Sequence, residues 1–152
     1  MLQFYEGRDR PHTIEMVEHH FYNRRNGVVG CIIEYENTAI GYIQYYPIHS
    51  DEKRKYQLPI SETIYGMDQF IGEIEYWNKG IGTLLVKSMV AYLKKDKNAD
   101  RIIMDPQVQN KRAVACYEKC GFQKVRLLPN NELHEGEYRD CWLIEYIKKP
   151  TF

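Results

Sequence analysis

The sequence predicts a mixed α/β fold in which helices connect the strands of one sheet. Runs of β-branched and aromatic residues alternate with polar residues, which is typical of half-buried strands. Two further segments, 80–95 and 112–120, place apolar residues at helical spacing. In the second half of the chain these helices alternate with strands, and this order favours helices that cross between strands of one sheet.

The chain is predicted to begin with a short helix over residues 13–22. Thr13 can cap this helix, and Ile14, Val17 and Phe21 lie on one of its faces.

A β-hairpin is predicted to follow. Residues 28–35 and 39–46 are rich in β-formers and flank a polar turn at 36–38. Residues 47–61 begin with a proline and carry many charged side chains, so we expect a mobile loop of the kind that covers substrates.

The second half of the chain alternates strands with helices. Gly121 is placed to end the second of these helices. Residues 129–139, between the last two strands, are predicted to be a polar loop. In chain order we expect a strand at 64–71, a helix at 80–95, a strand at 101–104, a helix at 112–120, and strands at 122–128 and 140–147.

Length and composition fit a single domain over residues 1–152. The 21 basic and 21 acidic residues cancel, which excludes a global basic field for nucleic acid. No apolar run approaches membrane-spanning length and the N-terminus does not resemble a signal peptide, so we expect a cytoplasmic protein without a membrane partner. The four cysteines complete no zinc pattern, so we expect free thiols and no metal.

A glycine-containing turn precedes the helix at 80–95. A strand, such a turn and a helix N-terminus together direct free backbone N–H groups at an anion. Gly80 and Gly82 allow the backbone to approach phosphate oxygens. The same glycines are equally suited to a tight turn without a ligand.

Several motifs then occur in one order along the chain: Trp77-Asn78-Lys79-Gly80-Ile81-Gly82-Thr83, Asp105-Pro106, Asn110-x-Arg112-Ala113 and Tyr117-Glu118-Lys119-x-Gly121-Phe122. Together they resemble the acetyl-CoA-binding core of the GCN5-related N-acetyltransferases (GNAT). The wider superfamily usually has Gln or Arg at the position of Trp77.

Three further motifs are similar to a narrower group, the aminoglycoside 6′-N-acetyltransferases, and within it to the acetyltransferase half of the bifunctional acetyltransferase–phosphotransferase. They are Tyr65-Gly66-Met67-Asp68-Gln69-Phe70-Ile71-Gly72-Glu73, Phe4-Tyr5-x-Gly7-Arg8-Asp9 and Glu132-Leu133-His134-Glu135-Gly136. The resemblance implies a GNAT fold, acetyl-CoA as cosubstrate, and acetyl transfer to the 6′-amine of aminoglycoside antibiotics, conferring resistance. Relatives carry a further N-terminal segment ahead of Phe4, so we expect this chain to lack the first strand of the fold.

The resemblance also implies which residues bind acetyl-CoA. The diphosphate would lie on backbone N–H groups before the helix at 80–95, and the pantetheine arm would run beside the strand at 64–71. Asn110 is equally suited to cap its own helix. The implied residues are Gln69, Phe70, Ile71, Trp77, Asn78, Lys79, Gly80, Ile81, Gly82, Thr83, Asn110, Ala113 and Tyr117.

Asp68 and Tyr117 are the predicted catalytic residues. A carboxylate beside the thioester attracts an ammonium group and accepts its proton, and Tyr117 matches the residue assigned in the superfamily as the acid for the departing thiolate. Alternatively, Asp68 is a surface residue in a salt bridge, and Tyr117 is a tyrosine of the hydrophobic core. Period-two alternation sets Asp68 opposite Met67 and Gln69, without deciding which face is buried.

Aminoglycosides carry several ammonium groups, so the substrate pocket should concentrate carboxylates. Each candidate acid is equally a solvated surface residue. The substrate-binding candidates are Asp68, Asp105, Asp140, Glu62 and Glu135, together with Tyr5 and Tyr65.

Direct attack in a ternary complex is expected, because Cys116 has no histidine neighbour to make it a nucleophile. Two alternatives remain at this stage: an acetyltransferase for another polyamine or a protein amine, and an inactive CoA-binding module. Either a monomer or a homodimer fits the sequence.

Overall fold

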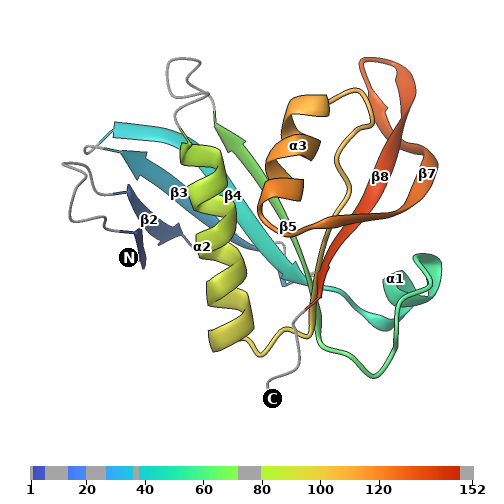
Figure 1. Ribbon diagram of the computed structural model, residues 1–152, viewed down its shortest axis with the longest axis horizontal. Helices are drawn as coiled ribbons and strands as arrows, with labels where there is room; N and C mark the ends of the chain where they lie inside the picture. The colour runs from blue at the N-terminus through green and yellow to red at the C-terminus, as the bar shows by residue number, and fades with distance from the viewer. Residues whose placement is uncertain (1, 6–13, 20–26, 36–37, 72–79, 148–152) are drawn as a thin grey trace.

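The computed structural model describes residues 2–5, 14–19, 27–35, 38–71 and 80–147. These residues form one eight-stranded sheet and three helices (Figure 1). The strand order is β1-β2-β3-β4-β5-β6-β8-β7, and only the β5–β6 pair is parallel. The elements are β1 (Leu2–Tyr5), β2 (Ile14–His19), β3 (Val29–Tyr35), β4 (Thr38–Pro47), α1 (Ser50–Lys55), β5 (Ile64–Ile71), α2 (Ile81–Asp96), β6 (Arg101–Met104), α3 (Lys111–Lys119), β7 (Gln123–His134) and β8 (Glu137–Ile147).

The mixed α/β sheet predicted from the sequence is confirmed. The β3–β4 hairpin, the strands β5 and β6, and the helices α2 and α3 lie where the residue pattern predicts them. The apolar periodicity of α2 places Leu85, Met89 and Leu93 on one face, and all three are fully buried.

The predicted helix over residues 13–22 is wrong. Residues Ile14–His19 form strand β2, which pairs antiparallel with β3. A short helix has little stability of its own, whereas the open edge of β3 offers a row of backbone partners. The side-chain pattern of this segment fits either a helix or a strand, and pairing with β3 therefore determines that it forms a strand.

The expected mobile loop at 47–61 contains helix α1 and is held in place. Acidic residues lie in the first turn of α1 and basic residues in its last turn, as the helix dipole favours. The Nζ atom of Lys53 donates to the carbonyl oxygens of Ile60 at 3.2 Å and Glu62 at 2.6 Å, and Leu58 is buried. The structure therefore corrects the expectation of a loose segment.

The predicted polar loop at 129–139 is also wrong, because β7 and β8 form a hairpin through this segment, with a shift of register between Leu128 and Glu132. Only Glu135 and Gly136 lie between the strands, with φ values of 50° and 81°. Positive φ at both central residues is the geometry of the two-residue turns that match strand twist. The turn, rather than the polarity of the flanking residues, determines the strand lengths.

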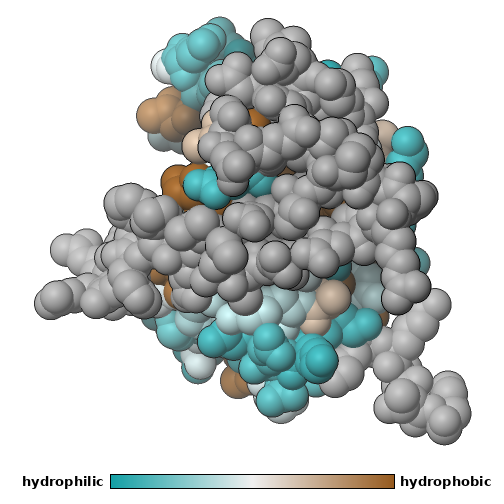
Figure 2. All heavy atoms as spheres, turned by 90° about the vertical axis from the view of Figure 1, so that its left-hand side faces the viewer, coloured by the Kyte–Doolittle hydropathy of each residue, from teal (hydrophilic) through white to brown (hydrophobic). Residues whose placement is uncertain are grey.

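The core has two parts, one on each face of the sheet. The larger part packs α2 and α3 against β3, β4, β5 and β6, and includes Ile43, Met67 and Leu85. The smaller part lies on the other face and comprises Ile48, Leu58, Ile64, Ile103 and Leu143. In the view of Figure 2, hydrophilic residues gather at the lower end, where Figure 1 places the C-terminal end of α2.

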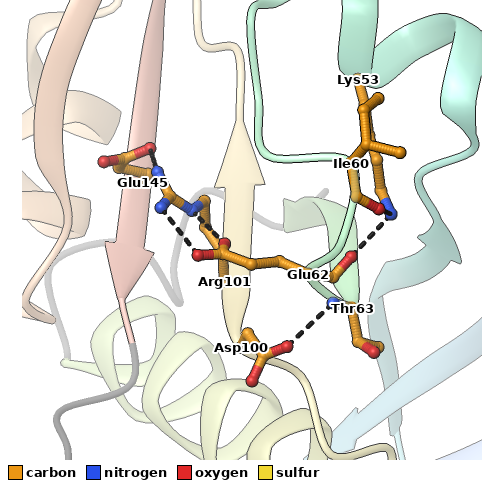
Figure 3. Close-up of polar contacts among 7 residues, drawn as sticks. All are labelled: Lys53, Ile60, Glu62, Thr63, Asp100, Arg101 and Glu145. Carbon is orange, nitrogen blue, oxygen red and sulfur yellow. Dashed lines mark hydrogen bonds and ion pairs between the residues drawn. The ribbon is translucent and has the colours of Figure 1, made fainter.

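Charged side chains hold the beginnings of β5 and β6 together (Figure 3). Arg101 contacts Glu62 at 2.8 Å and Glu145 at 2.7 Å, and its side chain is only 15% exposed. A carboxylate oxygen of Asp100 accepts a hydrogen bond from the backbone N–H of Thr63 at 2.9 Å. These contacts hold the end of the sheet from which β5 and β6 diverge.

No helix among the described residues is long and apolar enough to cross a membrane.

Candidate active site

Strands β5 and β6 run side by side only at their beginnings. Their pairing covers Ile64 to Gly66 on β5 and Arg101 to Ile103 on β6. β5 stays paired with β4 as far as Ile71, whereas no strand among the described residues pairs with its other edge beyond Gly66. Figure 1 shows β5 and β8 fanning apart from a common lower end, with α3 drawn across the opening. This edge offers backbone donors and acceptors to a ligand.

The two faces of β5 differ in what they contact. Met67 is fully buried and packs in the larger core with α2. Asp68 follows it and therefore points to the opposite face, where its side chain is exposed. The structure thus decides the question that the alternation left open.

Asp68 is held by a neighbouring strand. Gln44 on β4 lies directly across from it, and Nε2 of Gln44 donates to Oδ2 of Asp68 at 3.0 Å. The hydroxyl of Tyr42 donates in turn to Oε1 of Gln44 at 3.2 Å. This chain of two hydrogen bonds fixes the orientation of the carboxylate.

A second carboxylate, Asp105, follows β6 directly. Nδ2 of Asn131 donates to its Oδ2 atom at 3.0 Å. Burial, assisted by the charges of Asp68 and Glu132, raises the pKa of Asp105 to about 6 although the hydrogen bond from Asn131 lowers it. The structure therefore brings two mutually repelling acids to one region, and a cationic ligand would relieve their repulsion.

Tyr46 shares this region with the two acids. Burial first, and then the charges of Asp68 and Asp105, raise the pKa of Tyr46, so its hydroxyl keeps its proton. Its ring lies over Gly66, where a Cβ atom would come within 2.6 Å of Cζ. Only glycine leaves room for the ring at this position.

Tyr117 on α3 lies on the helix-covered face. It is 8% exposed and its ring centroid is 6.3 Å from that of Phe122. Burial, followed by the charge of Cys116, raises the pKa of Tyr117 to about 12, and a hydrogen bond with Gln69 lowers it. The Oε1 atom of Gln69 is buried without a partner among the described residues. A protonated hydroxyl and an unsatisfied acceptor therefore lie beside the open edge of β5.

Among the described residues, no side chain caps the N-terminus of α2. Gly80 precedes the helix with a φ of 75°, and a Cβ atom there would meet nothing within 4 Å. No acidic residue lies in the first turn and the residue at the N-cap provides no side-chain hydrogen bond. Free N–H groups and the helix dipole together favour an anion at this end.

Asn110 caps α3, which is the simpler of its two predicted roles. Its Oδ1 atom accepts a hydrogen bond from the backbone N–H of Ala113 at 3.2 Å. A contact of either residue with CoA stays a prediction.

Two acidic candidates have other partners. The carboxylate of Glu62 pairs with Arg101. Oδ1 of Asp140 accepts a hydrogen bond from the backbone N–H of Asn130 at 2.9 Å. Contacts of these acids with a substrate stay predictions. In the structure, Glu62 stabilises the beginning of β5 and β6, and Asp140 stabilises the β7–β8 hairpin.

The other two substrate candidates lie elsewhere. The side chain of Glu135 is 81% exposed in the turn between β7 and β8. Tyr65 lies on the helix-covered face with its ring centroid 6.3 Å from that of Tyr45. The side chain of Tyr65 therefore lies on the face opposite to that of Asp68.

Six predicted residues lie wholly or in their side chains outside the described part of the chain. They are Tyr5, Phe70, Ile71, Trp77, Asn78 and Lys79.

Sequence reasoning missed the residues that position the two acids. Gln44 is a polar residue within an apolar strand, and this is the signal in the sequence that could have identified it. Its pairing with Asp68 depends on the register between β4 and β5, and the contact between Asn131 and Asp105 depends on the hairpin of β7. Neither relation follows from local spacing.

Among the described residues, no cluster of three His, Cys, Asp or Glu side chains is placed to hold a metal ion.

In this fold two central strands of the sheet part, and a helix N-terminus lies beside the opening. Solved structures of other proteins share the fold. A structure of AAC(6')-Ib in complex with ribostamycin and coenzyme A has a TM-score of 0.61 at 23% identity, covering 82% of this chain and 66% of that one. A chimera of a Vibrio cholerae spermidine N-acetyltransferase has a TM-score of 0.65 at 21% identity, covering 82% and 71%. These similarities show a shared fold.

The profile of the Acetyltransferase (GNAT) domain matches residues 3–129. The chain belongs to the GNAT acetyltransferase family. The aminoglycoside N(6')-acetyltransferase type 1 of Klebsiella pneumoniae is 31% identical over 100 residues, which are 66% of this chain and 50% of that protein. The chain thus spans about half the length of these curated relatives.

Proposed function

We propose that the protein transfers an acetyl group from acetyl-CoA to the 6′-amino group of aminoglycoside antibiotics and so confers resistance in the cytoplasm. One domain over residues 1–152 would carry this activity, by direct attack in a ternary complex. The observation that carries the proposal is the oriented carboxylate of Asp68 on the exposed face of β5, beside a strand edge that β6 leaves open.

Acetyl-CoA supplies the acetyl group as a reactive thioester. The residues present fit this cosubstrate. The unsatisfied Oε1 atom of Gln69 accepts an N–H donor such as an amide of the pantetheine arm. The uncapped first turn of α2 suits the diphosphate.

Asp68 attracts the substrate ammonium and accepts its proton at a carboxylate oxygen. Its Oδ2 atom already accepts a hydrogen bond from Gln44, so Oδ1 is the oxygen available to the amine. A positioned base of this kind contributes about 10²- to 10⁴-fold in rate. Gln44 acts as a positioning residue, because it restricts the rotation of the carboxylate.

Tyr117 donates a proton from its hydroxyl to the departing sulfur. A group with a pKa of about 12 is fully protonated at neutral pH and available as an acid. Gln69 positions the hydroxyl through their hydrogen bond. The base and the acid lie on opposite faces of the sheet, so the open edge of β5 is where the reacting groups meet.

The choice of an aminoglycoside rests on charge and on the relatives. Asp68 and Asp105 provide two interacting negative charges for a polycationic substrate. The Klebsiella relative is named for this activity. The narrower likeness to the bifunctional acetyltransferase–phosphotransferase stays a prediction.

A second candidate function is acetylation of a linear polyamine, which the structural similarity to a spermidine N-acetyltransferase favours. The same two acids would bind its ammonium groups. The two substrates differ in shape rather than in charge, so turnover of each must be compared directly.

Acetyl transfer to kanamycin A, to its analogue with a 6′-hydroxyl group, and to spermidine tests the proposal. CoA release is followed with a thiol reagent. We expect turnover of kanamycin A, little with the 6′-hydroxyl analogue, and little with spermidine. Equal turnover of both aminoglycosides would refute the 6′ position, and preference for spermidine would establish the second candidate.

Asp68→Asn is the matched variant for this assay, because the amide keeps the shape of the carboxylate. We expect kcat to fall more than about tenfold with the affinity for acetyl-CoA nearly intact. Unchanged turnover would remove Asp68 from the chemistry.

A further inference from the structure

Cys116 on α3 and Cys120 at its C-cap meet the first turn of α2. The Sγ atom of Cys116 lies 3.5 Å from Oγ1 of Thr83, and the thiol of Cys120 donates to the carbonyl oxygen of Thr83 at 3.6 Å. The two thiols also hydrogen-bond to each other. One threonine and two sulfurs therefore form a compact cluster between the helices.

A disulfide between the two cysteines requires the last turn of α3 to move. They are separated by one helical turn, since the backbone N–H of Cys120 donates to the carbonyl oxygen of Cys116 at 3.2 Å. Residues four apart in a helix have Cα atoms about 6 Å apart, within the range of about 4.4–6.8 Å that disulfides span. Their Cβ atoms, however, are about 5–6 Å apart, and a disulfide needs about 3.5–4.5 Å. Cys120 is the C-cap of α3, and helix ends fray, so the backbone at Cys120 can shift to bring the two sulfurs together.

The surroundings make the two thiols unequal. Cys116 is half-buried and therefore reachable, whereas Cys120 is buried. Cys116 contacts the first turn of α2, whose dipole favours a negative charge. Cys120 is the C-cap of α3, where the dipole has the opposite sign. Hydrogen bonds from Cys120 and Thr83 lower the pKa of Cys116, whereas the hydrogen bond with Cys116 and burial raise the pKa of Cys120.

We propose that Cys116 and Cys120 are a redox-active dithiol that low-molecular-weight disulfides convert into an intrahelical disulfide. The Cys116 thiolate attacks one sulfur of the small disulfide, forms a mixed disulfide and releases one thiolate, which takes up a proton. Cys120 then loses its proton, its sulfur attacks Sγ of Cys116, and the second small thiolate leaves and is protonated. Two protein thiols are oxidised by two electrons, and one small disulfide is reduced to two thiols.

The disulfide would change the first turn of α2. The thiol of Cys120 donates to the carbonyl oxygen of Thr83, and the hydroxyl of Thr83 contacts Sγ of Cys116. Oxidation removes the S–H donor of Cys120 and moves the last turn of α3 against Thr83. Since the proposed function places the cosubstrate diphosphate at this turn, oxidation should weaken CoA binding, and this part of the inference rests on that proposal.

The first experiment treats the folded chain with oxidised glutathione and follows intact mass and peptide maps. We expect the wild type to lose two hydrogens, with the new disulfide joining Cys116 to Cys120. Cys120→Ser should stop at one glutathionyl group on Cys116, and Cys116→Ser should react at least about tenfold more slowly than Cys120→Ser. Cys31 and Cys141 are fully buried and serve as internal controls that should stay unmodified.

Three results would overturn the inference. One is labelling that reaches Cys31 or Cys141 as fast as Cys116. Another is a Cys116→Ser variant that reacts as fast as Cys120→Ser. The third is a stable mixed disulfide on the wild-type chain, because Cys120 would then not resolve it. None of these readouts needs acetyl-CoA, so they test the dithiol whatever the substrate is.

The second experiment measures CoA affinity of the reduced and the oxidised chain by calorimetry. We expect CoA to bind at least about tenfold more weakly after oxidation, and a reducing agent should restore the affinity. The control is Cys120→Ser, treated with the oxidant and then freed of its glutathionyl group. Its affinity for CoA should not change. Equal affinity of both forms would overturn the coupling to α2. Absence of binding by the reduced chain would instead refute the proposed function.

Discussion

Asp105 should make the folded protein less stable as the pH rises, and Asp105→Asn should remove this effect. Burial raises the pKa of Asp105 from an ordinary value of 3.8 to about 6, so the folded chain holds this proton more tightly than the unfolded chain. The stabilisation from the bound proton is complete below pH 3.8 and is lost as the pH rises through about 6. A shift from 3.8 to about 6 corresponds to about 3 kcal/mol.

Asparagine keeps the shape of the side chain and can still accept the hydrogen bond from Asn131. The free energy of unfolding of Asp105→Asn, minus that of the wild type, should therefore increase by about 2–3 kcal/mol from pH 3.8 to above pH 6. Urea unfolding of both chains across this range measures the difference. A difference that stays flat would refute the reasoning. Asp51→Asn is the control for removing a carboxylate from the surface, because that side chain is 98% exposed.

The same substitution should weaken substrate binding while it stabilises the fold. If Asp105 binds an ammonium group, Asp105→Asn should raise the KM for kanamycin A about tenfold, about 1.4 kcal/mol, with a smaller effect on kcat. An unchanged KM would leave Asp105 as a buried acid without a role in substrate binding.

Three further substitutions test other parts of the structure. Tyr117→Phe should lower kcat about tenfold or more with little change in the KM for acetyl-CoA, and a null result in the thiol-release assay would favour a proton from solvent. Gly66→Ala should cost about 1–3 kcal/mol in urea unfolding, because its Cβ atom would meet the ring of Tyr46, and an equal loss in a Tyr46→Leu background would contradict this cause. Arg101→Met should cost about 3 kcal/mol, since it leaves the carboxylates of Glu62 and Glu145 unpaired, and full stability of the variant would show that the ion pairs contribute nothing.

Residue pattern alone predicted the parts of the fold that local physics governs. Residues close together in the sequence determine three such features. They are the apolar face of α2, the cap provided by Asn110 and the alternation in β5. The resemblance of several motifs in order predicted the family, which the GNAT domain match confirms.

The tertiary structure decided what depends on partners distant in the chain. Residues 14–19 satisfy either a helix or a strand, and pairing with β3 selects the strand. Alternation placed Asp68 opposite Met67, but only the packing of α2 against Met67 turns the carboxylate to the other face. Asp105 meets the charge of Asp68 because β5 and β6 are neighbours, and Cys120 meets Thr83 because α2 and α3 pack together. Such contacts join segments far apart in sequence, so hydrophobic burial and strand register, rather than local propensity, determine them.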